Sequence, residues 1–378
     1  MLRKTPSEND LVDLHGKVAL VTGGNCGIGY ATVQMLARNG AKVYMAARNE
    51  GRAEAAIKQL QAENLNDGSV HWLKIDLLDP RDAQRAAKEF RQKEQRLDIL
   101  VNNAAMTAVG HFDLTQDGFL DVMVVNHISH FALTDALLPL LTATAREPGA
   151  DVRIVNLTSA AHAHVKPESF STKQAFNKDY GPSTGHLLRT YGTSKLANIL
   201  HIKALQTRLA AQDVPITCIA VHPGAIKTPG SASFLGGIPR IGSFLKTYIG
   251  PLLFAPPRKG ALTVAFAAAG KDVAAQRDKY MGAYLVPIAT LAAPSKYALD
   301  ERLQKELYET MLPLRRPRVV ALGGDDCCVC CVAGKEGASL VPMRITTLLR
   351  SVLGKRLQND SRFQIWILMS SRLSCPPN

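Results

Sequence analysis

Tyr191 and Lys195 stand four residues apart, just before a helix-compatible stretch at residues 196–209. On a helix, side chains at this spacing share one face. A free tyrosine has a pKa of about 10, which is too high for efficient proton transfer near neutrality. A neighbouring cation favours the phenolate and lowers that pKa. The pair therefore predicts general acid–base chemistry at an alcohol or carbonyl oxygen, with a surface pair at a helix start as the alternative.

Polar and small residues that follow successive apolar segments support this interpretation. They are Asn102-Asn103-Ala104-Ala105, Ser159 and Pro223-Gly224, with Asn126 in a helical stretch after the first of them. In doubly wound parallel sheets, ligands bind beyond the carboxyl ends of the strands. We therefore expect these residues to line one cleft together with the Tyr–Lys pair.

The segment Thr22-Gly23-Gly24-Asn25-Cys26-Gly27-Ile28-Gly29 lies between an apolar segment and a helix-compatible one. Glycines there permit a tight turn, let the backbone approach a pyrophosphate and allow close packing of helix on strand. Free N–H groups at the helix N-terminus favour bound phosphate. The pattern predicts a dinucleotide site, and its position near the N-terminus disfavours the alternative of an ordinary strand–helix turn.

The end of the second apolar segment bears on cofactor preference. An acid there usually hydrogen-bonds the adenosine ribose, whereas Arg accommodates a 2′-phosphate. No acid is present and Arg48 follows at once, which favours NADP(H), with a solvated surface charge as the alternative; Cys26 supplies no second cation. Asp76-Leu77 closes the third segment and is expected to hold the adenine, unless Asp76 caps a helix before Pro80.

Six short apolar segments alternate with longer helix-compatible stretches, which is the pattern of βαβ units and a parallel sheet. The expected strands are residues 17–21, 41–45, 70–75, 97–101, 152–157 and 216–221, and an edge strand at 283–287, where a terminal proline is tolerated. The expected helices include residues 28–39, 51–63 and 80–95. The predicted fold is α/β, a doubly wound parallel sheet (Rossmann fold), in a single domain with a C-terminal extension.

The expected boundaries are an N-terminal extension at residues 1–13, a catalytic domain at 14–312 and a tail at 313–378. The apolar and aromatic residues of 231–257 predict a substrate lid. The tail, with irregular apolar spacing and clustered cysteines, is expected to be disordered. Its cluster, Cys327 to Cys331, does not match structural zinc spacing; acylation and translated non-coding sequence are alternatives.

The 378 residues carry a formal net charge of +13. No basic run with interleaved aromatics stands out, so nucleic-acid binding is not expected. The charge better suits an anionic cofactor or peripheral contact with an acidic intracellular membrane. Residues 1–16 lack the apolar core of a signal peptide or membrane span, and the isolated Cys26 and Cys218 fit a reducing compartment. We expect a soluble, cytoplasmic body, with homo-oligomerisation left open.

Together, the motifs at the glycine loop, Asn102–Ala104, Ser159, Tyr191/Lys195 and Pro223-Gly224 resemble the short-chain dehydrogenase/reductase family over about residues 14–312. Residues 43–48, 126–131 and 191–198 are most similar to retinol-dehydrogenase-like and fungal reductase members. The resemblance implies that Ser159 polarises the substrate oxygen, Asn126 supports a water relay to Lys195, Lys195 binds the nicotinamide ribose and Thr228 contacts the carboxamide. The residues expected to bind cofactor are Gly23, Asn25, Gly27, Ile28, Gly29, Arg48, Asp76, Leu77, Asn103, Ala104, Tyr191, Lys195, Pro223, Gly224, Ile226 and Thr228.

Two positions depart from the family pattern. Ala105 stands where the family usually has Gly, and residues 165–189 lengthen the connection from Ser159 to Tyr191, as in retinol-dehydrogenase-like members. Four histidines, His127, His130, His162 and His164, lack Cys or acidic partners at ligand spacing, so no metal site is expected.

We predict an oxidoreductase that transfers a hydride between NADP(H), with NAD(H) less favoured, and a carbonyl or alcohol group of a lipophilic molecule. Asn126, Ser159, Tyr191 and Lys195 form its catalytic set. The alternative is a catalytically inactive dinucleotide-binding sensor or scaffold, which the presence of Ser159, Tyr191 and Lys195 disfavours.

Overall fold

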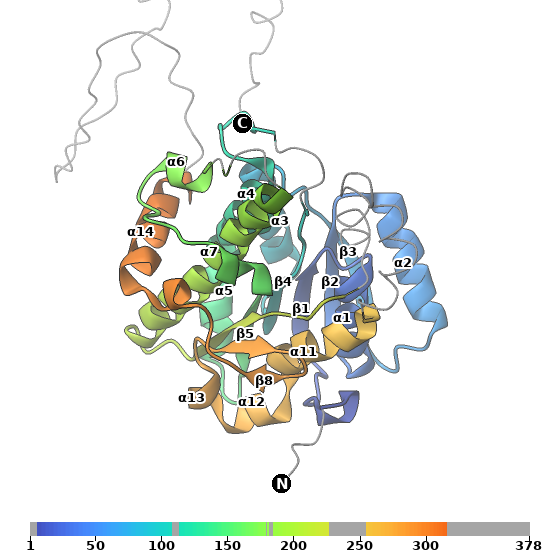
Figure 1. Cartoon of the computed structure of the whole chain (residues 1–378). Helices are drawn as coiled ribbons and strands as arrows, with labels where there is room; N and C mark the ends of the chain where they lie inside the picture. The colour runs from blue at the N-terminus through green and yellow to red at the C-terminus, as the bar shows by residue number, and fades with distance from the viewer. Residues whose placement is uncertain (1–5, 108–112, 179, 181–183, 227–254, 316–378) are drawn as a thin grey trace, which may run out of the picture. The chain divides into compact units, whose positions relative to one another are not determined.

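The computed structural model describes residues 6–107, 113–178, 180, 184–226 and 255–315, and all of them lie in one compact unit, Met1–Arg318 (Figure 1). The strands of its sheet are β1 (Val18–Thr22), β2 (Lys42–Ala47), β3 (Ser69–Lys74), β4 (Ile99–Asn102), β5 (Val152–Leu157), β6 (Ile216–Val221), β7 (Tyr284–Val286) and β8 (Thr290–Leu291). Their order is β3-β2-β1-β4-β5-β6-β7-β8, and only β7 and β8 pair antiparallel. The predicted doubly wound parallel sheet is confirmed.

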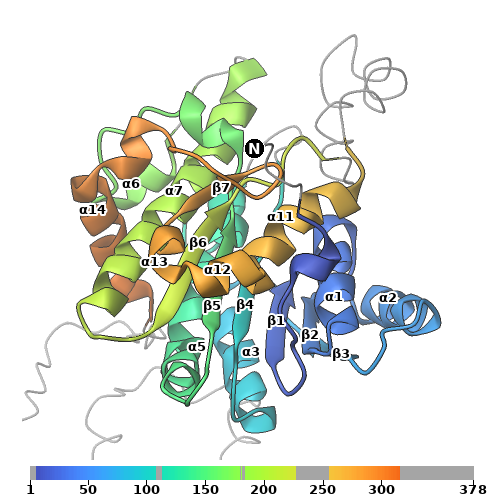
Figure 2. The same ribbon diagram turned by 90° about the horizontal axis from the view of Figure 1, so that it is seen from below.

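Helices cover both faces of the sheet (Figure 2). One face packs against α1 (Gly27–Arg38), α2 (Glu50–Ala62) and α11 (Pro257–Ala269). The other packs against α3 (Pro80–Lys93), α5 (Ser129–Ala145) and α7 (Thr184–Ala210), with α14 (Glu301–Met311) on the outer side of α7. Because β1, β5 and β6 are buried along their whole length, nearly continuous apolar sequence is what these strands require.

Shorter elements connect these layers. They are η1 (Glu8–Asp10), α4 (Asp121–Met123), the π-helical turn η2 (Val124–Ile128), η3 (Ala160–His164), α6 (Lys173–Phe176), α12 (Lys271–Ala275), α13 (Arg277–Tyr280), η5 (Lys296–Leu299) and η6 (Leu312–Arg315). The described part of the inserted segment, before residue 179, is anchored by Phe170 and Phe176, whose buried rings meet edge to face. Glu306 of α14 accepts hydrogen bonds from the Phe170 amide and the Ser169 hydroxyl, which ties the insertion to that helix.

The prediction of an edge strand at residues 283–287 was wrong in its position. β7 pairs with β6 on one side and with β8 on the other, so β8 forms this edge of the sheet. Pro287 immediately follows β7, in the connection to β8, where no ladder hydrogen bond is required of it. A strand of only two residues carries too little sequence pattern to be predicted.

One described helix, Asp121–Ala145, is long and apolar enough to cross a membrane by length and composition alone. Inside the fold, 61% of its most apolar window is buried. It packs against α3 and contributes Phe131, Leu133, Leu137 and Leu141 to the core. This burial is the pattern of a core helix of the sheet.

Candidate active site

Tyr191, Ser159 and Lys195 come together at the carboxyl end of β5. Ser159 lies near the Tyr191 hydroxyl and acts to lower its pKa, and the Lys195 Nζ lies 5.4 Å from the centre of the Tyr191 ring. Both Tyr191 and Lys195 lie inside α7, and the Lys195 side chain is buried. The alternative of a surface pair at a helix start is therefore wrong, because α7 begins at Thr184.

The backbone around Lys195 is fixed by hydrogen bonds to β5. Its carbonyl accepts from the Thr158 hydroxyl at 2.7 Å, and its Nζ donates to the Leu157 carbonyl at 3.3 Å. The Asn198 side chain, one turn further along α7, donates to the same Leu157 carbonyl at 2.9 Å. Thr158 and Asn198 were missed in the sequence, although Asn198 lies on the same helix face as Lys195.

Burial sets the pKa values of the pair. It raises the pKa of Tyr191 to about 12, against the opposing effect of the Ser159 side chain, and it lowers the pKa of Lys195 to about 7. The expected lowering of the Tyr191 pKa by Lys195 is therefore absent in this structure. The reason is that removal of water disfavours the charge on both groups, so Lys195 is itself only partly protonated near neutrality.

Asn126 lies within the π-helical turn η2, where the regular helical hydrogen-bond pattern is interrupted. Its side-chain oxygen accepts from the Met106 amide at 2.7 Å, while its side-chain nitrogen donates to the Met106 carbonyl and to the Ser194 hydroxyl, each at 3.0 Å. The side chain thus joins the segment after β4 to the Tyr–Lys helix. Both amide hydrogens of the side chain are used in this way, and the water relay that the family resemblance implies stays a prediction.

A hollow of about 370 Å³ lies beyond the ends of β1, β2 and β4. It brings together six of the residues predicted to bind cofactor, Gly23, Asn25, Arg48, Asp76, Leu77 and Ala104. Ala105, the departure from the family pattern, is exposed and also lines this hollow, so its extra methyl group is accommodated. The hollow has the position and lining that the adenosine part of a dinucleotide requires.

The glycine loop packs tightly against the segment after β4. A side chain on Gly29 would collide with the Gly23 carbonyl and the Asn103 side chain. The side-chain amide of Asn103 donates to the Thr22 carbonyl at 2.7 Å. Gly23 and Gly27 adopt positive φ angles of 63° and 57°. The α1 helix then begins at Gly27 without a side-chain cap, which leaves its first N–H groups for phosphate.

The structure shows the surroundings of Arg48 and Asp76, the two cofactor-site residues for which the sequence left an alternative. The exposed Arg48 guanidinium makes no ion pair within the described part of the chain and lines the hollow. The carboxylate of Asp76 accepts from the Leu78 amide at 3.0 Å, whereas Asp79 caps α3. The alternative that Asp76 is the helix cap before Pro80 was wrong.

The segment after β6 is described only in part. Gly224 adopts a φ of +98°, and a side chain there would meet Pro287. Ile226 forms an isolated parallel bridge with Ala255 and contacts Gly260 at the start of α11. Thr228 and residues 231–254 of the predicted lid lie outside the described residues.

His162 is a further residue whose role the sequence did not show. Its Nδ1 contacts the Ser159 carbonyl at 2.7 Å, and its Nε2 lies 3.0 Å from the Ser295 amide. Since a carbonyl only accepts and an amide only donates, the ring is neutral with its proton on Nδ1. Among the residues described, no group of three or more His, Cys, Asp or Glu side chains could hold a metal ion.

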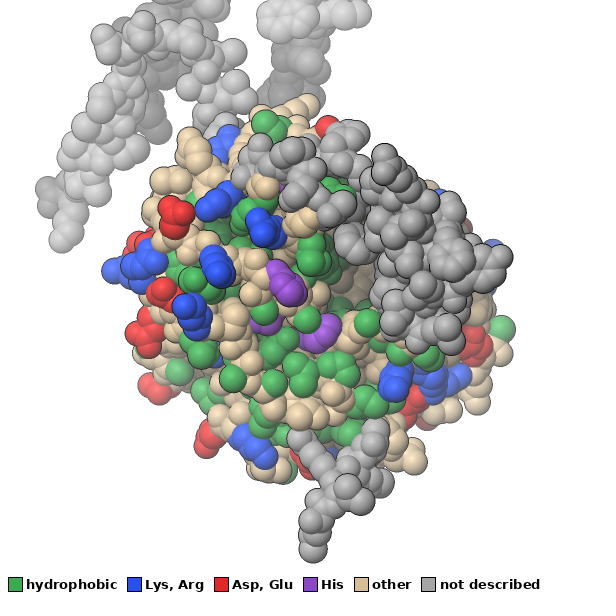
Figure 3. All heavy atoms as spheres, in the orientation of Figure 1, with side chains coloured by type: hydrophobic (Ala, Val, Ile, Leu, Met, Phe, Trp, Pro, Cys, Tyr) green, Lys and Arg blue, Asp and Glu red, His purple; other side chains and the backbone are tan. Residues whose placement is uncertain are grey.

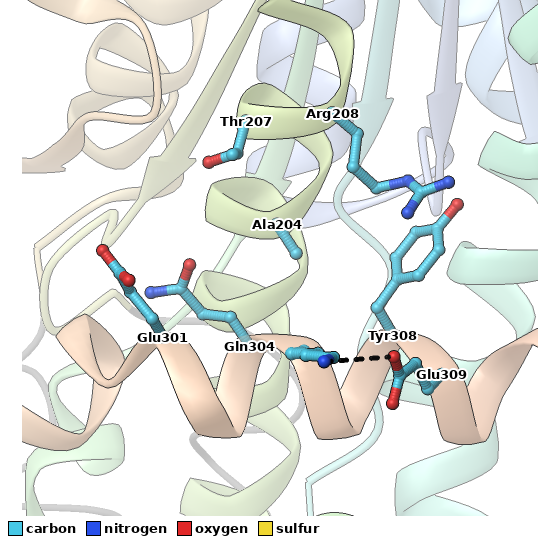
Figure 4. Close-up of a pocket in the computed structure, with 8 residues that line it drawn as sticks. Ala204, Thr207, Arg208, Glu301, Gln304, Tyr308 and Glu309 are labelled. Carbon is cyan, nitrogen blue, oxygen red and sulfur yellow. Dashed lines mark ion pairs between the residues drawn. The ribbon is translucent and has the colours of Figure 1, made fainter. Parts of the chain in front are cut away.

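A second hollow, of about 380 Å³, lies between α7 and α14, away from the predicted site residues (Figure 4). In it the Arg208 guanidinium lies 4.1 Å from the centre of the Tyr308 ring, and Lys305 pairs with Glu309. Tyr308 in turn meets Phe131 of α5 edge to face. These contacts hold α14 against the body of the fold.

The sequence comparisons agree with this geometry. The model of the short chain dehydrogenase family matches residues 17–172. A short-chain dehydrogenase/reductase from Armillaria gallica is 43% identical over 303 residues, covering 80% of this chain and 94% of that protein. The chain belongs to the short-chain dehydrogenase/reductase family. It is an oxidoreductase of the kind that acts on CH–OH and C=O groups, and the predicted family is confirmed.

Other short-chain dehydrogenase/reductase relatives are also similar to this chain. Retinol dehydrogenase 14 from Mus musculus is 33% identical over 280 residues, covering 71% of this chain and 78% of that protein. Among solved structures, an uncharacterized protein from Mycobacterium paratuberculosis has a TM-score of 0.61 at 26% identity, covering 82% of this chain and 98% of that one. An NADPH-bound carbonyl reductase from chicken fatty liver has a TM-score of 0.51 at 23% identity, covering 74% and 100%, which shows a shared fold.

Proposed function

We propose that this short-chain dehydrogenase/reductase transfers a hydride between NADP(H) and a carbonyl or alcohol group of a lipophilic small molecule, with Tyr191 as general acid and base. The observation that carries the proposal is that Ser159, Tyr191 and Lys195 lie together, with Ser159 acting on the Tyr191 hydroxyl and the Lys195 Nζ 5.4 Å from the centre of the Tyr191 ring. Two hydroxyl donors side by side at the end of β5 form a place where one substrate oxygen can be held.

In reduction, the substrate carbonyl oxygen accepts hydrogen bonds from Ser159 and Tyr191, which polarise the C=O bond. A dinucleotide held by the glycine loop and the hollow beyond β1, β2 and β4 would supply a hydride to the carbonyl carbon. Tyr191 then gives its phenolic proton to the oxygen, so that the carbonyl becomes an alcohol and Tyr191 becomes a phenolate. The protonated form of the adjacent Lys195, which the new negative charge favours, stabilises that phenolate, and solvent returns the proton. Oxidation runs the same steps backwards.

The preference for NADP(H) is supported by Arg48. The strand end offers no carboxylate to the adenosine ribose. The guanidinium of Arg48, which makes no ion pair with any described residue, lines the hollow beside Ala46 and Ala47. A 2′-phosphate is a strong partner for such a group, because Arg forms paired, charge-assisted hydrogen bonds with phosphate oxygens. Asp76 and Leu77 line the same hollow and are proposed to hold the adenine.

A lipophilic substrate is supported by the apolar composition of residues 231–257 and by the similarity to a retinol dehydrogenase. On the face drawn in Figure 3, hydrophobic side chains gather around histidines near the centre. Apolar surroundings with a few convergent polar groups are typical of sites for small lipophilic molecules.

The test is a panel of ketones, aldehydes and secondary alcohols assayed by the absorbance of the reduced nicotinamide, with NADPH and NADH in parallel. The proposal expects turnover of apolar carbonyl compounds, faster with NADPH. Tight NADPH binding without turnover of any panel member would favour the alternative of an inactive dinucleotide-binding sensor. No binding of either cofactor would contradict both functions.

A further inference from the structure

His130 connects two parts of the active site that come from different strands and helices. Its Nε2 lies 2.8 Å from the hydroxyl of Thr22 at the end of β1, and its Nδ1 lies 3.2 Å from the carbonyl of Asn126 in the π-helical turn. His130 and Asn126 are both buried, with exposed fractions of 1% and 0%. Neither contact can be replaced by solvent.

The hydrogen-bond chemistry fixes the state of His130. The Asn126 carbonyl can only accept, so Nδ1 carries the proton and donates it. The Thr22 hydroxyl already accepts from the backbone amides of Asn103 and Ala104, at 2.9 and 3.0 Å. Its one proton can go to Nε2 at 2.8 Å or to the Val101 carbonyl at 3.5 Å, and the shorter contact favours Nε2. Burial and the nearby Lys195 lower the pKa of His130 to about 3, which agrees with a neutral ring near neutrality.

The two ends of this connection have different tasks. Thr22 holds the Asn103-Ala104 backbone against the glycine loop, and Ala104 lines the cofactor hollow. Asn126 contacts Met106 and the Ser194 hydroxyl, next to Lys195, through its side chain, and its carbonyl faces His130 Nδ1. A shift of the His130 ring would move both the Thr22 hydroxyl and the Asn126 peptide.

We propose that His130 is a positioning residue that orients the Thr22 hydroxyl toward the cofactor segment and the Asn126 peptide toward the catalytic helix, as a neutral imidazole with its proton on Nδ1. The expected effects of His130 on NADPH binding and turnover rest on the proposed function. The hydrogen bonds of His130 do not depend on that function.

Three substitutions separate the two contacts. The amide of His130→Asn reaches the position of Nδ1 and keeps a donor for Asn126, but it is too short for Thr22. The longer His130→Gln reaches Thr22 and loses the local donor. His130→Phe keeps the ring shape and loses both contacts. Loss of one buried hydrogen bond corresponds to roughly a tenfold effect.

We expect His130→Asn to raise the Kd for NADPH about tenfold, measured by fluorescence titration, and His130→Gln to leave that Kd nearly unchanged while lowering kcat about tenfold. His130→Phe should show both effects. His201→Phe, the same change at another buried ring that touches Phe131, is the matched control, and it should alter the melting temperature without either effect. A role in packing alone predicts the reverse order, with His130→Phe the mildest variant, and would overturn the proposal.

A second measurement tests the predicted tautomer of His130 and requires no enzymatic activity. In full-length protein labelled with ¹⁵N-histidine, long-range ¹H–¹⁵N correlation distinguishes the two neutral tautomers, and His130→Phe assigns the signal. We expect the Nδ1–H form at neutral pH. An Nε2–H form or an imidazolium would overturn the inference even if the enzyme is active, whereas an Nδ1–H form in a protein that binds no NADPH would contradict only the proposed function.

Discussion

A β-carbon built on Gly192 would lie 2.5 Å from the carbonyl oxygen of Ala161. Gly192 follows Tyr191 in α7, and Ala161 lies in η3, two residues after Ser159. The missing side chain therefore lets the two elements approach closely, which brings Ser159 near the Tyr191 hydroxyl. The Val165 side chain, 2.8 Å from the same β-carbon, could shift, but the Ala161 carbonyl belongs to the backbone and cannot yield without moving η3.

Gly192→Ala should force α7 away from η3 and lengthen the Tyr191–Ser159 contact. We expect kcat to fall by at least about tenfold and the melting temperature to fall by several degrees, as for overpacking that costs about 1–3 kcal/mol. Gly51→Ala is the control, because a β-carbon on Gly51 in α2 would meet only the Asn49 Oδ1, at an ordinary contact distance of 3.9 Å. That change should leave activity intact and stabilise slightly. Equal behaviour of the two variants would show that the close contact does not matter.

Tyr191→Phe removes the proposed proton donor and keeps the ring. We expect nearly unchanged NADPH binding and a loss of turnover of roughly 10²- to 10⁴-fold, as for a general acid–base group. Single-turnover absorbance measurements and a fluorescence titration check the two parts. Tyr297→Phe, at a half-buried tyrosine remote from the site residues in sequence, serves as the control. Wild-type turnover in Tyr191→Phe would remove this residue from the mechanism.

Arg48→Ala should weaken NADPH binding far more than NADH binding, because only NADPH carries the 2′-phosphate. A charge-assisted hydrogen bond of about 1.5–3 kcal/mol corresponds to roughly a 10- to 150-fold change in Kd. Titration of each reduced cofactor against wild type and variant gives the four Kd values. A similar loss for both cofactors would show that Arg48 acts on the fold or on a shared part of the ligand.

Lys195→Met should stabilise the cofactor-free protein near neutral pH while abolishing turnover. Burial lowers the pKa of Lys195 from 10.5 to about 7, so between these values the unfolded chain holds a proton that the folded chain has released. The wild-type free energy of unfolding therefore rises with pH across that range and carries its full penalty below about pH 7. Melting temperatures measured from pH 6 to 10 should show the variant's advantage shrinking as pH rises, and an advantage independent of pH would refute the linkage.

Deletion of residues 318–378 should leave a folded enzyme. Within the described residues, α14 already completes the core, with Leu303, Leu307 and Met311 buried against it. We expect the truncated and full-length proteins to melt at similar temperatures with NADPH present and to turn over the same substrates. A large fall in melting temperature on truncation would mean that the deleted segment packs on the body.

The sequence predicted what local pattern encodes. Buried strands such as β5 and β6 appear as apolar runs with the observed bounds, and the Tyr191–Lys195 spacing indicated a shared helix face before any geometry was known. Contacts between residues that are far apart in the sequence were not predictable. The hydrogen bond of His162 to Ser295 joins residues 133 positions apart, and the choice of Asp79 over Asp76 as helix cap depends on where the chain turns after β3.

The edge of the sheet formed by β8 has a consequence for behaviour at high concentration. A parallel sheet that ended on a long, flat apolar strand would offer a row of free N–H and C=O groups to a neighbouring molecule. Here the antiparallel return at Thr290–Leu291 leaves only two residues in that position, and Thr290 is exposed. A second molecule can add little more than one rung of a ladder there, so this side of the protein is built to resist strand-to-strand aggregation.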